Sequence, residues 1–576
     1  MNINQLYRLS APPLIAFLLY VALVGFMSSL ASGHDVQIKN SAAADIQTQQ
    51  NSTAAPNSAS SGFMALWGSE KAVDDFTKRY SDVLELLRIY PNPQAYLAEA
   101  PGRIRWNENI DTLRLYQVTP PTADISRLLN DLKETPNIRG TAETSWLSYM
   151  PGEFMLSGDC SDVDVFIQSH EQLERILTLG GEIKLSDPLC IRRYIIEEDT
   201  EKVANLVERI MRMRDEERGD IYAEPIFITG ALQPIIHGSP GAQTGPGAPP
   251  LDLPETASAG SGVSVVVFDN YSTPANTPTR DTITVAGVPI SVTSPFDINP
   301  NAPQQSRNIE THGTIVVNAI TELVPDADIR LIRVLNADGY GTTYQLMAGI
   351  QGVISRTLPI SNSFSGVVFN YSLGLDTTAT LTTSNALSEM LSYVDSFNIV
   401  QIAAAGNDSA FTLIPQPMRL PAAHPKVIGI SALTTRRQPA CYANQGEFFV
   451  IGGGVERGLL CRVKRIVLDC SKGVGNANCI TGGGGPPKDN YWGVGTSFAA
   501  PRVSGVAAAI IAAGRPTSVS NGITADGPTA WTKPAIVRAA LADIAANLCD
   551  PNARNALIYA PGDCALGLPQ IWGYIE

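Results

Sequence analysis

A serine that could act as a nucleophile lies directly before an apolar stretch near the end of the chain. Ser497 is the third residue of Gly-Thr-Ser-Phe-Ala-Ala-Pro, residues 495–501, and the apolar stretch 503–513 follows it. A helix that began here would place free N–H groups and the positive end of its dipole beside the serine. Because a serine hydroxyl is a weak nucleophile at neutral pH, this chemistry also needs an adjacent base.

Two residues upstream could complete such a site. His312 lies in Thr-His-Gly-Thr, residues 311–314, and Asp269 ends the apolar run 263–268. A histidine can take the serine proton and later return it to the leaving group. A buried carboxylate can hold the imidazole in one tautomer and stabilise its charged form. The spacing of these residues in the sequence does not show that they are close in space. Their proximity depends on how the strands and helices that carry them are arranged.

Apolar runs alternate with helix-like segments from residue 261 onward. We expect strands at 263–268, 329–335, 366–372, 399–405 and 426–432, and helices at 312–323, 343–355, 384–397 and 497–513. Near-continuous apolar strands that alternate with helices predict an α/β domain whose mainly parallel sheet is covered on both faces. Functional sites form at the carboxyl ends of such strands, which is where Asp269 and Asn407 fall.

The chain order Asp269, His312, Ser497, together with the motif around each residue, resembles the subtilisin-like (S8) family of serine peptidases. The resemblance covers roughly residues 260 to 545 and implies a subtilisin-like three-layer αβα fold. It also implies the roles of orienting acid, general base and nucleophile for the three residues, in that order. Asn407, after the apolar strand 399–405, matches the family's asparagine that donates to the oxyanion, with the backbone N–H of Ser497 as second donor.

The resemblance further implies a cleft that takes an extended peptide between two segments by strand addition, so the expected substrates are proteins or peptides. Gly374 and Gly406 would leave the S1 pocket open, which favours a sizeable uncharged P1 residue. The matching substrate-binding residues are Gly339, Tyr340, Gly341, Ser372, Leu373, Gly374, Ala405 and Gly406.

The first 60 residues have the character of an export signal and a tether. Residues 1–31 contain a short apolar stretch followed by small residues, which predicts a secretory signal peptide. Residues 32–60 are rich in Ala, Ser, Asn, Gln and Thr and are expected to be a disordered linker. We therefore expect a secreted or periplasmic protein, and a signal-anchored membrane form if the signal is not cleaved.

Two regions precede the peptidase-like part. Residues 61–150 are expected to be a helical extension of unknown role, because 124–132 repeat apolar residues at helical spacing. Residues 151–229 read as strand, helix and strand ending in Tyr-Ala-Glu-Pro, which resembles a subtilisin-family prodomain and implies a foldase and intramolecular inhibitor. The alternative is a small α+β domain of unrelated use. The Pro/Gly-rich linker 230–260 is the expected maturation site.

The chain has 8 cysteines, and an even number behind a signal peptide indicates disulfides in an oxidising compartment. We expect a Cys160–Cys190 bridge in the prodomain-like unit and a Cys549–Cys564 clamp at the end. Pairing stays open for the cysteines in and around a Gly-rich insertion at about 453–490, which are Cys441, Cys461, Cys470 and Cys479. Free thiols are the alternative, and no spacing favours a zinc site.

The formal net charge of -14 argues against nucleic acid as a partner. The triad requires no cofactor or metal, and structural calcium is implied only at the level of the family. The sequence therefore predicts a secreted serine endopeptidase made as a self-processing zymogen. A catalytically inactive secreted binding protein on the same scaffold is the alternative, and an esterase is less favoured because a small ester would not use peptide-binding strands.

Overall fold

The computed structural model describes most of the chain between residues 63 and 559. The described residues are 63–81, 83–90, 93–100, 110–118, 125–142, 144, 147–197, 202–217, 220–231, 235–237, 260–270, 282–285, 288–293, 312–321, 323–336, 339–356, 366–375, 384–411, 415–434, 438–452, 492–514, 533–547 and 558–559. The predicted signal peptide, the linker 32–60, most of the linker 230–260, and the insertion 453–490 with Cys461, Cys470 and Cys479 lie outside them, as do Cys549 and Cys564.

The first domain is an α+β unit. Its elements are β1 (Phe63–Gly68), α2 (Glu70–Arg79), β2 (Leu84–Ile89), α3 (Pro93–Glu99), β3 (Thr112–Val118), α4 (Ile125–Lys133) and β4 (Ile138–Thr141). The strands form an antiparallel sheet in the order β2-β3-β1-β4.

The prediction of a helical extension at 61–150 was therefore wrong, although α4 lies where helical spacing indicated a helix. The reason lies in the burial of β1. Met64 and Leu66 join one apolar cluster while Ala65 and Trp67 join another, so both faces of this strand are covered. A strand buried on both faces has no alternation of polar and apolar residues to reveal it.

The second domain has the same kind of sheet. Its elements are β5 (Tyr149–Asp159), α5 (Cys160–Ser169), α6 (Glu171–Ile176), β6 (Leu177–Lys184), β7 (Leu189–Ile196), α7 (Val203–Glu217) and β8 (Tyr222–Ala231). Antiparallel pairing gives the strand order β8-β5-β7-β6. The expected strand, helix and strand are β7, α7 and β8, and α7 buries Val203, Leu206 and Ile210 as its apolar stripe predicts.

The third domain is built on a nine-stranded sheet in the order β11-β12-β13-β10-β15-β17-β18-β19-β21. From β12 to β19 in this order every neighbouring pair is parallel. The edge strands β11 and β21 pair antiparallel with their neighbours. The sheet strands are β10 (Val263–Asn270), β11 (Thr282–Val285), β12 (Val288–Thr293), β13 (Asp328–Leu335), β15 (Gly366–Tyr371), β17 (Val400–Ala404), β18 (Ile428–Leu433), β19 (Phe448–Ile451) and β21 (Ile558–Tyr559). Its helices are α8 (His312–Thr321), α9 (Thr343–Arg356), α10 (Asn385–Ser396), η4 (Asp408–Phe411), α11 (Thr496–Ala513) and α12 (Pro534–Asn547).

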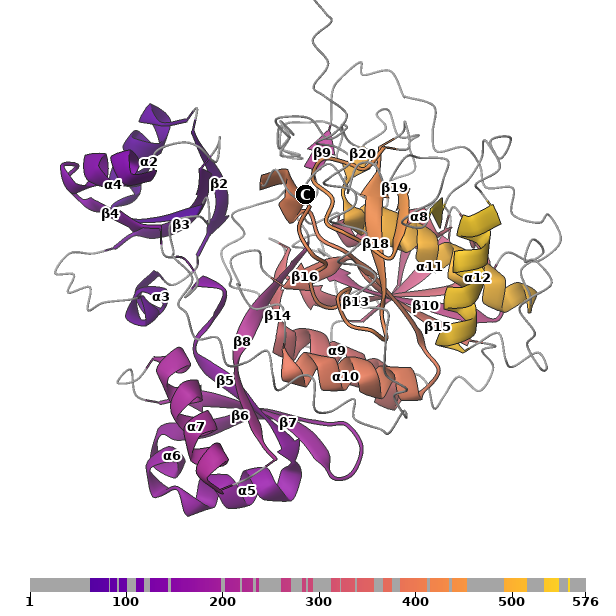
Figure 1. Cartoon of the computed structure of the whole chain (residues 1–576), viewed down its shortest axis with the longest axis horizontal. Coiled ribbons are helices and arrows are strands. Elements are labelled where there is room, and N and C mark those ends of the chain that lie inside the picture. The colour runs from indigo at the N-terminus through magenta and orange to yellow at the C-terminus, as the bar shows by residue number, and fades with distance from the viewer. Residues whose placement is uncertain are drawn as a thin grey trace, which may run out of the picture. The chain divides into compact units, whose positions relative to one another are not determined.

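Apolar side chains cover both faces of this sheet, as the apolar strands predict. Val265 and Val267 of β10 point into a cluster with α8 and α11, whereas Val266 and Phe268 point into the cluster that contains α9 and α10. Figure 1 shows α9 and α10 together on one side of the strands and α11 with α12 on the other. Each fully buried side chain of this size contributes roughly 1.5–3 kcal/mol, so the sheet is a rigid support for residues at its strand ends.

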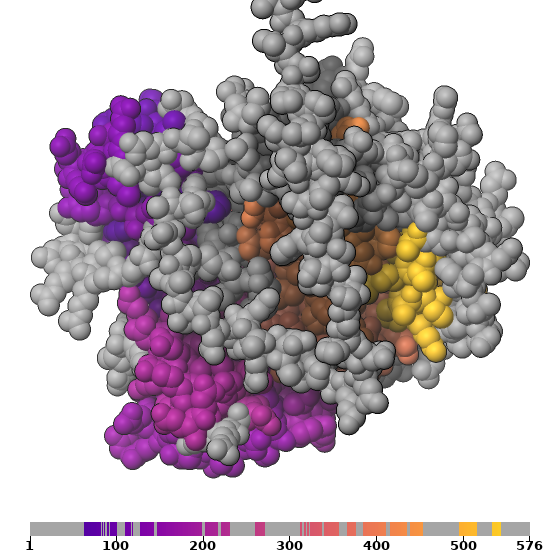
Figure 2. Space-filling view, in the orientation of Figure 1, coloured from indigo at the N-terminus to yellow at the C-terminus, as the bar shows by residue number. Residues whose placement is uncertain are grey.

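The helix that follows Ser497 is the central helix of this domain. Among the described helices, α11 is long and apolar enough to span a membrane, but 78% of that window is buried inside the protein. The next helix, α12, lies at the surface, where it is coloured yellow in Figure 2, and buries Val537, Ala540 and Leu541.

Candidate active site

The carboxyl end of β10 and the start of α8 bring Asp269 and His312 together. Nδ1 of His312 lies 2.8 Å from Oδ1 and 3.0 Å from Oδ2 of Asp269, and both residues are fully buried. Oδ1 also accepts the backbone N–H of Asn270 at 2.7 Å. This arrangement fixes the proton on Nδ1 and leaves Nε2 as the basic nitrogen. Nε2 is buried and has no hydrogen-bond partner among the described residues.

Close approach of two backbones holds the histidine in this position. The N–H of Gly313 donates to Oδ1 of Asn270 at 3.0 Å. A Cβ on Gly313 would lie 2.2 Å from the carbonyl oxygen of Asn270, so only glycine fits after His312. Asn270 was not among the predicted site residues. Its place directly after Asp269 at a strand end was the only signal that could have found it.

The loop before α11 brings Ser497 and Asn407 to the same place. A Cβ on Gly495 would lie 3.2 Å from Nδ2 of Asn407 and 3.4 Å from Oγ of Ser497. The ring of Phe498 lies 5.3 Å from the ring of His312, which puts the first turn of α11 against the histidine. An amide donor and a hydroxyl thus meet around a position that has no side chain, and the next residue, Phe498, contacts the imidazole.

Thr496 determines which end of the Asn407 amide faces this space. Oδ1 of Asn407 accepts both the N–H and the hydroxyl of Thr496 at 3.0 Å, so Nδ2 points away from the helix. The hydroxyl of Thr496 also accepts the N–H of Gly406 at 3.2 Å. Thr496 was not among the predicted site residues, because a threonine at a helix start ordinarily indicates only a cap.

A second buried asparagine, Asn444, holds the residues that follow Asn407 in place by hydrogen bonds. Nδ2 of Asn444 donates to Oδ2 of Asp408 at 2.8 Å, and its Oδ1 accepts the N–H of Ser409 at 3.0 Å. Gly406 has φ 120°, and a Cβ there would lie 2.3 Å from Nδ2 of Asn444. Ala405 and Gly406 are therefore held by this loop, and their predicted contact with substrate stays a prediction.

A chain of buried hydrogen bonds connects the start of α11, which carries Ser497, to β15. Nδ2 of Asn370 donates to the hydroxyl of Ser372 at 2.9 Å, which donates to the backbone oxygen of Ser497 at 2.9 Å. The hydroxyl of Ser504, two turns along α11, donates to Oδ1 of Asn370 at 3.0 Å. Ser372 was predicted to contact substrate, and in the structure its side chain positions the start of α11.

The last strand of the second domain pairs with the two edge segments that were predicted to bind substrate. The end of β8 pairs antiparallel with β14 (Tyr340–Thr342) on one side and β16 (Leu373–Leu375) on the other. Gly230 pairs with both Tyr340 and Gly374. Gly339, which precedes β14, has φ 79° and allows the turn there. Both segments thus bind an extended strand through backbone groups.

A second short strand of the chain then pairs next to the segment that carries Ser497. Strand β9 (Ile235–His237) pairs antiparallel with β20 (Trp492–Val494), which ends two residues before Thr496. Ala231 is the last residue of β8, and only residues 232–234 separate it from β9. One continuous stretch of chain therefore follows both the predicted peptide-binding segments and the strand next to Ser497.

Comparison with known proteins agrees with this geometry. The model of the subtilase family, described as Peptidase_S8, matches residues 260–556, which is just over half of the chain. The chain belongs to the subtilase family.

Individual relatives of this subtilase align over shorter stretches. Subtilisin E from Bacillus subtilis (strain 168) is 30% identical over 166 residues, covering 28% of this chain and 40% of the relative. The minor extracellular protease Epr from the same organism is 24% identical over 196 residues, covering 33% of this chain and 26% of the relative. The subtilase thus spans less than half the length of these curated relatives.

The second domain of the subtilase also caps a helix of its third domain. Glu224 of β8 is buried and accepts the hydroxyl of Ser384 at 2.6 Å and the N–H of Asn385 at 2.7 Å, at the start of α10. Burial raises the pKa of Glu224 to about 7, and these hydrogen bonds oppose the rise. Glu389 of α10 is a second carboxyl nearby whose pKa burial raises.

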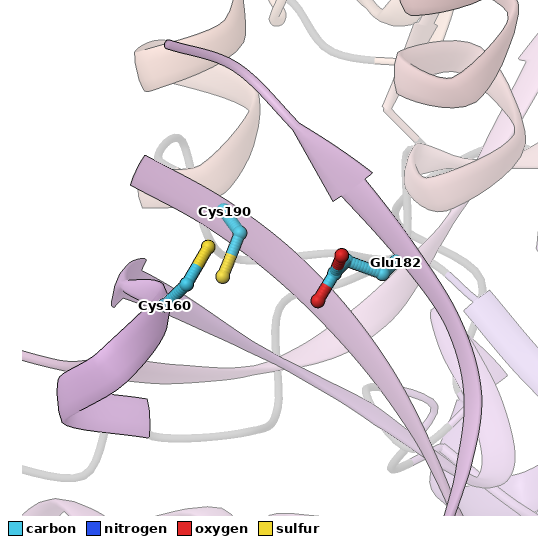
Figure 3. Close-up of side chains that lie close together, drawn as sticks. All are labelled: Cys160, Glu182 and Cys190. Carbon is cyan, nitrogen blue, oxygen red and sulfur yellow. The ribbon is translucent and has the colours of Figure 1, made fainter. Parts of the chain in front are cut away.

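The second domain of the subtilase carries a pair of cysteines. Figure 3 shows the sulfur atoms of Cys160, at the start of α5, and Cys190, in β7, facing each other beside Glu182. The three ligand atoms lie within 4.8 Å of one another, but Glu182 is bound by Nε of Arg192 at 2.7 Å. Both cysteines are thiols, so the predicted bridge is not present, and burial raises the pKa of Cys190 to about 12. Cys441 is disulfide-bonded.

Proposed function

We propose that this subtilase is a serine endopeptidase that hydrolyses peptide bonds through Asp269, His312 and Ser497. The observation that carries the proposal is that the Asn407 amide and the Ser497 hydroxyl meet around Gly495, while Phe498 in the same helix turn contacts an imidazole anchored by Asp269. Family membership and the buried, oriented histidine support it further. The chain supplies nucleophile, base and oxyanion donors, so the proposed reaction requires no cofactor.

The proposed reaction has two steps. Oγ of Ser497 attacks the scissile carbonyl carbon while Nε2 of His312 takes the hydroxyl proton. Nδ2 of Asn407 and the N–H of Ser497 donate to the oxyanion, and Asp269 stabilises the imidazolium. The imidazolium then protonates the leaving amine and leaves an acyl-enzyme. Water, which gives a proton to Nε2, attacks the ester, and that proton returns to Ser497 as the acid product departs.

We infer that the second domain, 149–231, is the prodomain of a zymogen and inhibits the enzyme with its own tail. The pairing of β8 with β14 and β16 supports this, because a tail bound there competes with substrate for the same backbone groups. Since β8 ends at Ala231 and β9 begins at Ile235, the bond cut in this arrangement falls between those residues. Leu232 supplies a sizeable uncharged residue at this point of the sequence.

We also propose export to an oxidising compartment, such as the periplasm or the extracellular medium. The apolar signal-like segment 1–31 and the disulfide at Cys441 support this location. The partners in this proposal are protein or peptide substrates and the chain's own prodomain.

The test compares purified wild type with Ser497→Ala by intact mass and N-terminal sequencing. We expect wild type to begin between residues 232 and 235 and the variant to keep its prodomain. A variant that matures by itself in pure form would contradict self-processing. A fluorophosphonate probe then separates the proposal from the inactive binding protein, because the probe labels only an activated serine. Absence of label on mature, folded protein would favour the binding protein.

A further inference from the structure

The first two domains of the chain have the same topology. Each follows the order strand, helix, two strands, helix, strand, with an added helix α3 in the first domain and a two-part first helix in the second. The sheet orders β2-β3-β1-β4 and β6-β7-β5-β8 correspond strand for strand, and every neighbouring pair is antiparallel. The region 63–141 is thus a second unit of the prodomain type.

A buried carboxylate of the first domain caps a helix of the second. Glu99, the last residue of α3, is 6% exposed, and its two carboxylate oxygens accept the N–H of Val203 at 3.0 and 3.2 Å. Val203 begins α7, whose first N–H groups have no partner within the helix. Glu99 also accepts the N–H of Gly152 in β5 at 3.4 Å. One side chain therefore connects α3 to both the central strand and the long helix of the second domain.

Other contacts between these two domains surround Glu99. Nζ of Lys202 donates to the backbone oxygen of Glu99 at 3.1 Å and also to that of Ala100. The hydroxyl of Tyr96 lies 3.7 Å from the sulfur of Met150, and Trp67 and Tyr96 share an apolar cluster with residues of β5. Glu99 is thus buried among polar and apolar contacts between the two domains, where an unpartnered N–H costs more than at the surface.

The same chemistry occurs one step further along the chain. Glu224 of the second domain caps α10 of the third through Ser384 and Asn385, as Glu99 of the first caps α7 of the second. In both cases a glutamate from the preceding domain satisfies the N-terminal N–H of a helix in the following one. The first and second domains therefore each supply a hydrogen-bond acceptor for a helix start in the domain that follows.

We propose that the first domain, 63–141, is a second pro-segment whose function is to hold the prodomain 149–231 in its folded, inhibitory form. Glu99 binds the prodomain at the start of α7 and at β5, and the neighbouring contact of Tyr96 with Met150 adds to this interface. This inference rests on the proposed zymogen function of the same chain. Loss of the contact loosens the prodomain first, and release of the β8 tail from β14 and β16 follows from that loosening.

The experiment measures amide hydrogen exchange in the full chain carrying Ser497→Ala, so that the result does not depend on proteolysis. In this background Glu99→Ala leaves the N–H of Val203 without its partner, while Glu99→Gln keeps one acceptor oxygen. We expect exchange in α7 and β5 to be about ten-fold faster in Glu99→Ala and to rise less in Glu99→Gln. The third-domain strands β10 to β18 should not change.

A matched control is Glu171→Ala in the first turn of α6. This glutamate is also in the prodomain, but its side chain is 75% exposed, and among the described residues its ion pair is with Arg175 in the same helix. We expect its exchange pattern to match that of the parent chain. Exchange in α7 that is equal in Glu99→Ala and the parent, or a rise confined to residues 63–141, would overturn the proposal. The exchange experiment uses the inactive Ser497→Ala chain, so a negative exchange result does not contradict the proposed peptidase activity. Likewise, an absence of peptidase activity in wild type would not change the exchange result.

Discussion

Two buried carboxylates of this subtilase have different hydrogen-bond partners, and the difference distinguishes the proposed catalytic site from an interdomain contact. Asp269 faces the imidazole of His312 and one backbone N–H, so its neighbour can itself take up a proton. Glu224 faces only a serine hydroxyl and N–H groups of a helix start, with the carboxyl of Glu389 nearby. The first arrangement suits proton transfer, whereas the second suits a contact whose strength depends on pH.

The strongest test of the catalytic half of this comparison is Asp269→Asn. The amide cannot hold His312 in the same tautomer or stabilise its charged form, so we expect kcat to fall by about 10⁴-fold. The measurement is steady-state cleavage of a chromogenic peptide with a large uncharged P1 residue. Asp326→Asn, at an exposed aspartate before β13, is the control and should retain full activity. Equal rates for both variants would remove Asp269 from the mechanism.

A smaller effect is expected at Asn407. Asn407→Ala removes one of the two proposed oxyanion donors while Asp269, His312 and Ser497 remain, so kcat should fall by about 10²–10³-fold with little change in KM. The same peptide assay measures both constants, and Ser355→Ala, at an exposed residue of α9, is the control. A rise in KM with kcat unchanged would place Asn407 in substrate binding and not in stabilisation of the transition state.

The smallest effect is expected at Glu224, through pH. Burial raises the pKa of Glu224 from its ordinary value of 4.5 to about 7 in the folded chain. Folding therefore binds a proton between these values. The contribution to stability is fully present below pH 4.5 and is lost as the pH rises to about 7, on the order of 3 kcal/mol in all.

Denaturant unfolding of the Ser497→Ala chain at pH 4.5 and pH 7.5 measures this loss, with Glu224→Gln as its partner variant. Glutamine keeps an acceptor for Ser384 and does not titrate, so the difference between the two pH values should shrink in this variant. An unchanged pH dependence would mean that other carboxyls, Glu389 among them, account for it. The interdomain contact would then be a fixed cap, and the contrast with Asp269 would not hold.

Prediction from the sequence succeeded where a pattern is local. The runs 263–268 and 399–405 correspond to β10 and β17, and the stretch from 497 to 513 corresponds to α11. Such segments are mostly apolar and are bounded by glycine or polar residues, so their length and position can be read directly. The motif residues at their ends were named for the same reason.

Prediction failed where a residue acts through partners far along the chain. Asn270, Thr496 and Asn444 position the site by hydrogen bonds to residues of other elements, and nothing in their neighbours distinguishes them from turn or cap residues. The sheet of the first domain was missed because β1 is covered on both sides and shows no alternation. The Cys160–Cys190 bridge was expected from the even number of cysteines behind a signal peptide, whereas the structure has two adjacent thiols.

The sequence by itself determined the α/β class, the order of the core strands and helices, and the identity of the residues at Asp269, His312, Asn407 and Ser497. It could do so because hydrophobic periodicity and short motifs are properties of neighbouring residues. Only the tertiary structure decided that β8 lies between β14 and β16, that Glu99 and Glu224 each cap a helix of the following domain, and that the first two domains share one topology. These features depend on pairing and burial between segments that are distant in the chain, a hundred or more residues apart for the contacts between domains, and a linear pattern holds no signal for them.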